Sequence, residues 1–298
     1  MLSTTSRFLG TRLTLASAFT PLASPRLFSS SPDLVFETLK AFPDEPTNPA
    51  SIAVLRMARP AAKNALGRQM LSEFVDALEA IPQDQSLRAV ILTSEVERVF
   101  CAGADLKERR TMSQQEAGMF VSKLRNSFTS LANLPLPVIA AVEGAALGGG
   151  IEIALACDMR VAGKNAIFGL PETSLAIIPG AGGTQRLPRL IGAARAKELM
   201  FTARRINADE AEKYGVVNHT VEAGAAFDKA FEIATEIARN GPIGVRAAKT
   251  AVDVGLQTDL TSGMEVERAC YAQTIPTADR MEGLNAFREK RKPIYKGE

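Results

Sequence analysis

Two glutamates, Glu152 and Glu172, each follow a short run of glycine and other small residues. The chain has a single histidine, His219, so acid–base chemistry must fall mainly to carboxylates, lysines or tyrosines. Two carboxylates beside one water molecule can divide that work, because an ionised carboxylate accepts a proton while a protonated one donates it. The sequence leaves open which of the two would hold the proton, and a coupled pair can share it.

Three glycines at 148–150 stand where a helix is expected to begin, just ahead of Glu152. Glycine lets a ligand approach the bare N–H groups of a helix start, where the helix dipole also favours negative charge, so the segment suits an anionic oxygen. A packing loop followed by a favourable first-turn carboxylate explains the same residues equally well. A phosphate-binding loop does not, because the required glycine and lysine spacings are absent. Glu172 taken alone is equally consistent with a solvated loop charge.

Composition excludes several other kinds of chemistry. The three cysteines, Cys101, Cys157 and Cys270, are far apart and form no CxxC pair, so neither a disulfide framework nor a structural zinc site is expected. With one histidine, a multi-histidine metal centre is also not expected. No apolar run reaches the ~20 residues that a membrane-spanning helix needs. The apolar content of 46% is ordinary for a globular protein.

Residues 1–31 have the composition of a mitochondrial transit peptide. They contain Arg7, Arg12 and Arg26, many serines and threonines, and no acidic residue before Asp33. The sequence around Arg26 and Ser29 resembles a processing site, which predicts a protein of the mitochondrial matrix; a disordered tail is the alternative. Removing residues 1–28 takes away three arginines and no acid, which leaves 32 basic and 33 acidic residues. The mature chain therefore has no charge bias that would indicate nucleic-acid binding.

Apolar spacing predicts how these segments are positioned. Segments of strand length at 51–57, 87–93 and 138–142, the second a nearly continuous apolar run, indicate buried strands, and shorter strands are expected at 159–162 and 167–168. Helices are expected at 67–81, 113–134, 151–157 and from 183 towards 201, and from residue 223 the pattern is helical to the end. Strands that alternate with helices predict one α/β domain with right-handed crossovers, followed by a helical C-terminal portion.

Taken together, three long segments resemble the crotonase (enoyl-CoA hydratase/isomerase) family. They are FCAGADLKER at 100–109, ALGGGIEIALACD at 146–158 and AIIPGAGGTQRLPRLIG at 176–192, and the C-terminal 269–298 segment matches as well. The resemblance implies a spiral of ββα units. It divides the chain into the transit peptide at 1–31, an α/β crotonase core at 32–222 and a helical trimerisation region at 223–298. Trimers or hexamers are implied with it.

The same resemblance assigns residues to a site. Glu152 and Glu172 match the two catalytic glutamates, and the amides of Ala104 and Gly149 match an oxyanion hole. The residues that would border coenzyme A are Ala62, Lys63, Asn64, Ala65, Leu66, Ala104, Asp105, Leu106, Lys107 and Gly149. Water would attack a conjugated thioester, and the two amides would hold the negative charge that develops on its oxygen. No metal or redox cofactor is expected, since coenzyme A belongs to the substrate.

Three alternatives to hydration remain. A double-bond isomerase of this family can work with one carboxylate, so the presence of both glutamates favours a hydratase, whether specialised or a general short-chain one. RNA binding occurs in the family through a lysine-rich helix, but the matching stretch from Arg68 to Arg88 has no lysine and four acidic residues. An inactive scaffold is disfavoured because both glutamates and both small oxyanion positions are present.

Overall fold

The computed structural model describes residues 31–45 and 47–298. The expected transit peptide at 1–31 therefore lies, apart from its last residue, outside the described residues. Residues 32–298 form one compact unit. None of the helices in the described part of the chain is long and apolar enough to cross a membrane.

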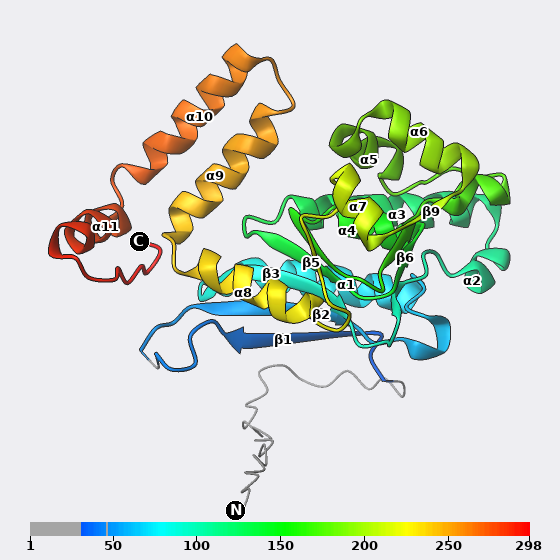
Figure 1. The fold of residues 1–298 in the computed structure, drawn as a ribbon, viewed down its shortest axis with the longest axis horizontal. Coiled ribbons are helices and arrows are strands. Elements are labelled where there is room, and N and C mark those ends of the chain that lie inside the picture. Colours follow the sequence, from blue (N-terminus) through cyan, green and yellow to red (C-terminus); the bar gives the residue numbers. More distant parts are fainter. Residues whose placement is uncertain (1–30, 46) are drawn as a thin grey trace, which may run out of the picture. The chain divides into compact units, whose positions relative to one another are not determined.

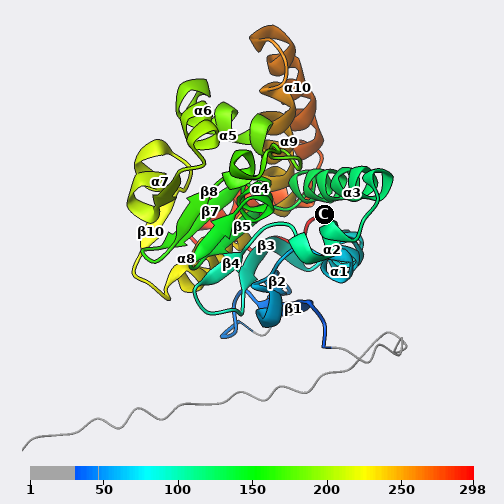
Figure 2. The ribbon, with the colours of Figure 1, turned by 90° about the vertical axis from the view of Figure 1, so that its right-hand side faces the viewer.

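A six-stranded sheet runs through the middle of this unit, and its strand order can be followed in Figure 2. In order across the sheet, the strands are β1 (Leu34–Lys40), β2 (Ser51–Met57), β3 (Leu87–Ser94), β5 (Val138–Val142), β7 (Met159–Gly163) and β10 (His219–Val221). Within this six-stranded sheet β1 and β2 pair antiparallel, and all the other neighbouring strands pair parallel. All five residues of β5 are buried. Such burial on both faces explains the uninterrupted apolar runs in the sequence.

A smaller, four-stranded sheet supplies the second strand of each strand–strand–helix repeat. Its strands are β4 (Val99–Cys101), β6 (Ala145–Leu147), β8 (Ile167–Gly169) and β9 (Arg205–Asn207). Along the chain β3–β4, β5–β6 and β7–β8 each place one strand in each sheet before the next helix. This strand–strand–helix repeat is the ββα arrangement that the family resemblance implied.

Helices cover the larger sheet on both faces. On one face α1 (Arg68–Ala80) packs with α3 (Gln114–Ala132), where Phe74 and Phe128 meet edge to face at 6.4 Å. On the other face lies α8 (Ala226–Ala238), whose buried alanines recur every four residues. A row of such small side chains on one helix face lets the helix backbone lie close to the strands. The two faces thus have separate apolar clusters.

The remaining helices follow the sheets or precede the site. Their bounds are η1 (Pro60–Ala62), η2 (Ile81–Gln83), α2 (Leu106–Arg110), α4 (Gly149–Leu155), η3 (Pro171–Leu175), α5 (Gly183–Ile191), α6 (Ala193–Thr202), α7 (Ala208–Tyr214), α9 (Pro242–Gly255), α10 (Leu260–Thr274) and α11 (Ala278–Glu289). Figure 1 shows α9 and α10 side by side. Lys249 of α9 ties this C-terminal group to the sheet, because its ammonium lies 2.8 Å from Asp158 and donates to the Leu136 carbonyl.

The structure contains elements that the sequence did not predict, among them the short strands β4, β6, β9 and β10, and two further differences have a clear physical reason. Strand β1 was not expected, although its residues alternate between more and less buried positions in the pattern of an edge strand. The segment from 183 to 201 was expected as one helix, but it forms α5 and α6. The break falls at Gly192, whose φ of +84° is a conformation that glycine adopts without a steric penalty.

Candidate active site

A cavity of about 1030 Å³ opens between the glycine-rich segments. Its lining includes Ala104, Gly149, Glu152 and Glu172, so the structure brings together both predicted glutamates and both predicted oxyanion residues. The rest of the lining comes mainly from α2, α3, η3, the loop before α5 and the start of α5, with one residue from β9. Within the described residues no three histidine, cysteine or carboxylate side chains are grouped as a metal site.

The glycines at 148–150 make a turn between β6 and α4 that other residues would obstruct. Gly148 has a φ of +54°, and a Cβ on Gly150 would lie 2.1 Å from the carbonyl oxygen of Cys101. Because no side chain stands between them, the start of α4 lies directly against the 101–104 segment. A Cβ on Gly149 would be 3.7 Å from the amide nitrogen of Ala104. The turn therefore puts two backbone segments, with Ala104 and Gly149 45 positions apart in the sequence, at one edge of the cavity.

The amides of Ala104 and Gly149 are both available to a ligand. Leu66 donates to the Gly103 carbonyl and Asp105 donates to the Leu66 carbonyl, which leaves the Ala104 amide between them unused. Gly149 is the first residue of α4 and has no intrahelical acceptor for its N–H. Among the described residues neither amide donates a hydrogen bond. Two such donors at one edge of a cavity can hold an oxygen that gains negative charge.

Glu152 lies in the first turn of α4 and is 3% exposed. One of its oxygens, Oε1, accepts hydrogen bonds from the amides of Ala181 at 2.8 Å and Gly183 at 2.7 Å, at the start of α5. Burial raises the pKa of Glu152, and the two amide hydrogen bonds oppose that rise. The carboxylate thus links two helix starts and leaves its second oxygen free of these bonds.

Glu172 lies in η3 and has a different environment. Its Oε2 is buried and has no hydrogen-bond partner in the described part of the chain. Burial, with a contribution from the charge of Glu152, raises the pKa of Glu172 to about 7. A carboxyl group with this pKa exchanges a proton near neutral pH, which is where a general acid or base works best. Gly148 also matters, since a Cβ on it would come within 3.1 Å of Glu172 Oε1.

The residues expected to border coenzyme A take several different positions. Ala104, Leu106 and Gly149 line the cavity. Asn64 is fully buried, and its side chain bonds Arg59, Ser94 and Phe100.

Asp105 caps α2 and pairs with Arg59, so its carboxylate is already occupied within the protein. Lys107 is exposed, and Ala62, Lys63, Ala65 and Leu66 form the loop beside Ala104 without lining the cavity. This loop contributes to the site through its backbone, which pairs with the segment that holds Ala104.

Three arginines that the sequence prediction did not assign to the site also line the cavity. Arg109 comes from α2, Arg125 from α3 and Arg205 from β9. The Nε of Arg125 donates to the Gly180 carbonyl at 3.0 Å, in the loop that binds Glu152. Arg125 lies four residues after Val121, so both are on the face of α3 that lines the cavity. The loop at 175–182 supplies much of the apolar lining.

Known proteins are similar to this chain in sequence over most of its length. The enoyl-CoA hydratase/isomerase family matches residues 47–298. The mitochondrial methylglutaconyl-CoA hydratase of Homo sapiens is 52% identical over 251 residues, which cover 83% of this chain and 74% of that protein. The mitochondrial enoyl-CoA hydratase domain-containing protein 2 of Bos taurus is also 52% identical, over 83% of this chain and 85% of its own.

A solved structure supports the same conclusion at the level of the fold. The crystal structure of an enoyl-CoA hydratase from Bacillus anthracis superimposes with a TM-score of 0.83 at 48% identity, covering 89% of this chain and all of that chain. The chain belongs to the enoyl-CoA hydratase/isomerase family, and its α/β fold is the crotonase fold that the sequence predicted.

Proposed function

We propose that this protein is a hydro-lyase that adds water across the 2,3 double bond of an enoyl-CoA thioester. The observation that carries the proposal is the pair of glutamates with raised pKa values in one cavity, beside two unused backbone amides. The amides of Ala104 and Gly149 would hold the thioester oxygen. Attack of water on the β-carbon moves charge to that oxygen, so these donors act where the transition state needs them.

The two glutamates would divide the proton transfers. Glu152 receives two amide hydrogen bonds, which favour its ionised form and suit it to accept a proton from water. Glu172 lacks such partners on Oε2 and titrates at about 7, so it suits the delivery of a proton to the α-carbon. Hydration uses two carboxyl groups, one that accepts a proton from water and one that delivers a proton to carbon. Double-bond migration needs only one carboxylate that shuttles a proton, so the presence of both favours hydration. Isomerase activity is the second candidate.

For the acyl group we propose 3-methylglutaconyl, because the human relative is named methylglutaconyl-CoA hydratase. Such an acyl chain carries its own carboxylate, and Arg109, Arg125 and Arg205 put positive charge on the cavity wall. A general short-chain hydratase would have no use for a cation at the acyl end. The arginines are also suited to the phosphates of coenzyme A, so the acyl group has to be decided by comparing substrates.

The test is a panel of steady-state assays on the purified protein. Hydration of 3-methylglutaconyl-CoA, crotonyl-CoA and a longer straight-chain 2-enoyl-CoA is followed beside migration of the double bond in a 3-enoyl-CoA. We expect hydration to exceed isomerisation, and the carboxylated substrate to have the highest kcat/KM. Arg125→Gln and Arg109→Gln should separate the two possible partners of these arginines. Loss of the preference for the carboxylated substrate identifies a contact with the acyl group. An equal loss of kcat/KM on all substrates identifies a contact with coenzyme A. Faster isomerisation than hydration would contradict the proposal.

We also propose that the protein works in the mitochondrial matrix, as a trimer or hexamer, without a metal or redox cofactor and without RNA. The acid-free leader supports the compartment. The family alone does not fix it, since a Bacillus anthracis protein shares the fold. Helix α1 carries Glu73, Asp76 and Glu79, which disfavours a phosphate-binding surface there. Mass spectrometry of the protein from its native source should find an N-terminus near residue 28, and not Met1.

A further inference from the structure

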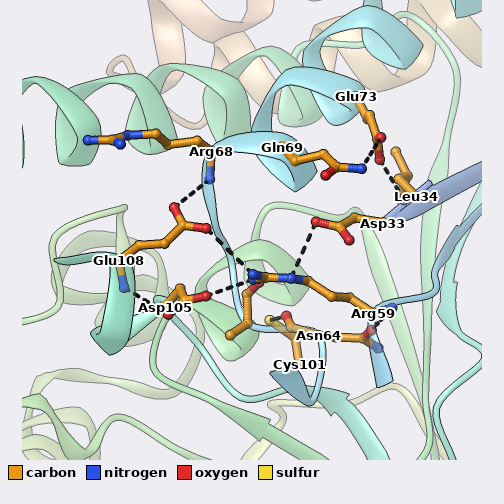
Figure 3. A network of polar contacts seen from close by, with 11 residues as sticks. Asp33, Leu34, Arg59, Asn64, Arg68, Gln69, Glu73, Cys101, Asp105 and Glu108 are labelled. Atoms are coloured by element: carbon orange, nitrogen blue, oxygen red, sulfur yellow. Dashed lines mark hydrogen bonds and ion pairs between the residues drawn. The ribbon is translucent and has the colours of Figure 1, made fainter. Parts of the chain in front are cut away.

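One guanidinium, that of Arg59, stands at the centre of a polar network beside the active site (Figure 3). Three carboxylates surround it: Asp105 at 2.8 Å, Asp33 at 3.4 Å and Glu108 at 3.5 Å. Its Nη1 also donates to the Ala65 carbonyl at 2.8 Å. The side chain is 22% exposed, so these contacts are shielded from most of the solvent. Arg59 does not line the cavity.

The contacts of Arg59 hold both chain segments that enclose the Ala104 amide. One segment is the 62–66 loop, which Arg59 binds through the Ala65 carbonyl. The other begins α2, and Arg59 binds it through Asp105. The two segments are also joined by backbone hydrogen bonds from Leu66 to the Gly103 carbonyl, from Asp105 to the Leu66 carbonyl and from Ala102 to the Lys63 carbonyl. Ala104 lies between them with its N–H unused.

The network also reaches Gly149 through packing. A Cβ on Gly149 would lie 2.8 Å from Cδ1 of Leu66, so the Leu66 side chain lies against the second oxyanion residue. Glu108, at the far side of Arg59, accepts a hydrogen bond from the amide of Arg68 at the start of α1. One guanidinium thus connects the 62–66 loop, α1 and α2 around the place where the two amides meet.

We infer that Arg59 is a positioning residue for the proposed reaction: it fixes the Ala104 amide relative to the Gly149 amide, and thereby sets how strongly the pair holds an enolate oxygen. The inference rests on the proposed function, since it assigns Arg59 to the oxyanion hole of that reaction. The guanidinium meets the Ala65 carbonyl and Asp105 through Nη1, while its Nη2 faces Glu108 and its Nε faces Asp33. A lysine ammonium has one nitrogen and cannot reproduce these directions together. A displacement of about 1 Å in such a site can cost ~10²-fold in rate.

The pKa of Asp105 is consistent with its contact to Arg59. Burial by itself would raise the pKa of Asp105, but the hydrogen bond from the Glu108 amide and the bond and charge of Arg59 outweigh it, and the pKa is lowered. The carboxylate therefore stays ionised and bound to Arg59 through the pH range in which the enzyme would work.

The matched variants are Arg59→Met, Arg59→Lys and, as control, Arg56→Met. Arg56 has the same 22% exposure, forms its own 2.6 Å ion pair with Glu37, and does not line the cavity. Acetoacetyl-CoA is the probe, because its enolate carries negative charge on oxygen and absorbs ultraviolet light differently from the keto form. The apparent pKa of the bound probe then measures the strength of the oxyanion donors without any turnover. Hydration of crotonyl-CoA and binding of free coenzyme A are measured alongside.

We expect Arg59→Met to lower kcat by about 10- to 10²-fold and to raise the pKa of bound acetoacetyl-CoA towards its value in water. Binding of free coenzyme A should change little, Arg59→Lys should fall in between, and Arg56→Met should match the wild type. Asp105→Asn keeps the helix cap but removes the charged partner, so it should act in the same direction and decides the question if Arg59→Met does not fold.

Two results would overturn the inference. The first is an unchanged enolate pKa and kcat in Arg59→Met, or in Asp105→Asn if the former does not fold. The second is an equal loss in Arg56→Met, which would show a general effect of weakening β2. Wild-type protein that hydrates no enoyl-CoA would be a different outcome, because it would overturn the proposed function and this inference with it.

Discussion

Glu152 is buried and Glu172 is half-buried, and their hydrogen-bond partners differ. Glu152 has two amide donors on Oε1, whereas Glu172 has a buried Oε2 with no partner among the described residues. Hydrogen bonds to an ionised carboxylate stabilise it, and burial without them favours the protonated form. The pair therefore has the asymmetry that acid–base catalysis around one water requires. Because the charges interact, the two protons dissociate as properties of the pair.

The first prediction concerns Glu172 and protein stability. Its pKa of about 7 lies above the ordinary 4.5, so folding favours the protonated form. That contribution is complete below about pH 4.5 and is lost as pH rises through about 7. Glu172→Gln removes the buried charge and should raise the free energy of unfolding by about 1–3 kcal/mol at about pH 8.5, with a much smaller gain at about pH 5.

Urea denaturation of both proteins at the two pH values measures this difference. Glu152 titrates in wild type and variant alike, so most of its effect cancels, apart from its repulsion with Glu172. An equal gain at both pH values, or a loss at the higher one, would show that Glu172 is not held in an unfavourable environment when ionised.

Among the elements, the start of α4 is the one on which the site depends most. It lies against the 101–104 segment only because no side chain separates them, and Gly150 makes the closest approach, with a Cβ position 2.1 Å from the Cys101 carbonyl oxygen. Backbone on both sides cannot move aside as a flexible side chain can. Any Cβ at this position would have to push α4, and with it the amide of Gly149, away from Ala104.

Gly150→Ala should consequently lose at least about 1–3 kcal/mol of stability and most of the activity, because the added methyl overpacks the contact. Gly118→Ala is the control, since a Cβ at Gly118 in α3 meets nothing within 4 Å. It should gain about 0.5–1 kcal/mol from the higher helix propensity of alanine. Thermal unfolding and hydration assays on both variants test the pair; a Gly150→Ala enzyme with wild-type activity would mean that the close approach is dispensable.

The elements that could be predicted from sequence are those with a strong local signal. Strand β5 is apolar throughout and β2 is apolar except for Ser51 and Arg56, and both were predicted to the residue. Strands β4, β6, β9 and β10 have three residues each, too few for a clear periodicity, and they were missed. For the site, local spacing only made Glu152 and the glycine turn candidates, and the family resemblance assigned them. The partners of Glu152, the Ala181 and Gly183 amides, lie 29 and 31 residues along the chain, so only the fold reveals them.

On the scale of the whole molecule, helices α9 to α11 leave large apolar side chains exposed. Leu256 is 83% exposed, Leu260 82% and Phe287 87%. Large apolar side chains that are this exposed are candidates for an interaction site. The trimerisation region at 223–298 stays a prediction of the family resemblance, and α8 within that range packs on the six-stranded sheet of its own chain.

We expect the protein to sediment as a trimer or a hexamer at micromolar concentration. Leu256→Ser combined with Phe287→Ser should shift it towards the monomer, because both changes remove exposed apolar area that association would bury. Phe36→Thr on the edge strand β1, where Phe36 is 39% exposed, should leave the assembly intact. Sedimentation equilibrium distinguishes these cases, and a monomeric wild-type protein would contradict the assignment of these helices.

The central claim is that Glu152 and Glu172 act together on one water, and the kinetics of Glu152→Gln, Glu172→Gln and the double variant test it most directly. Glutamine keeps the shape but cannot exchange a proton, so each single change should lower kcat for hydration by about 10²–10⁴-fold. Groups that act as a unit are not additive, so the double variant should be far less impaired than the product of the two losses. Hydration at near wild-type rate in either single variant would contradict the two-carboxylate mechanism.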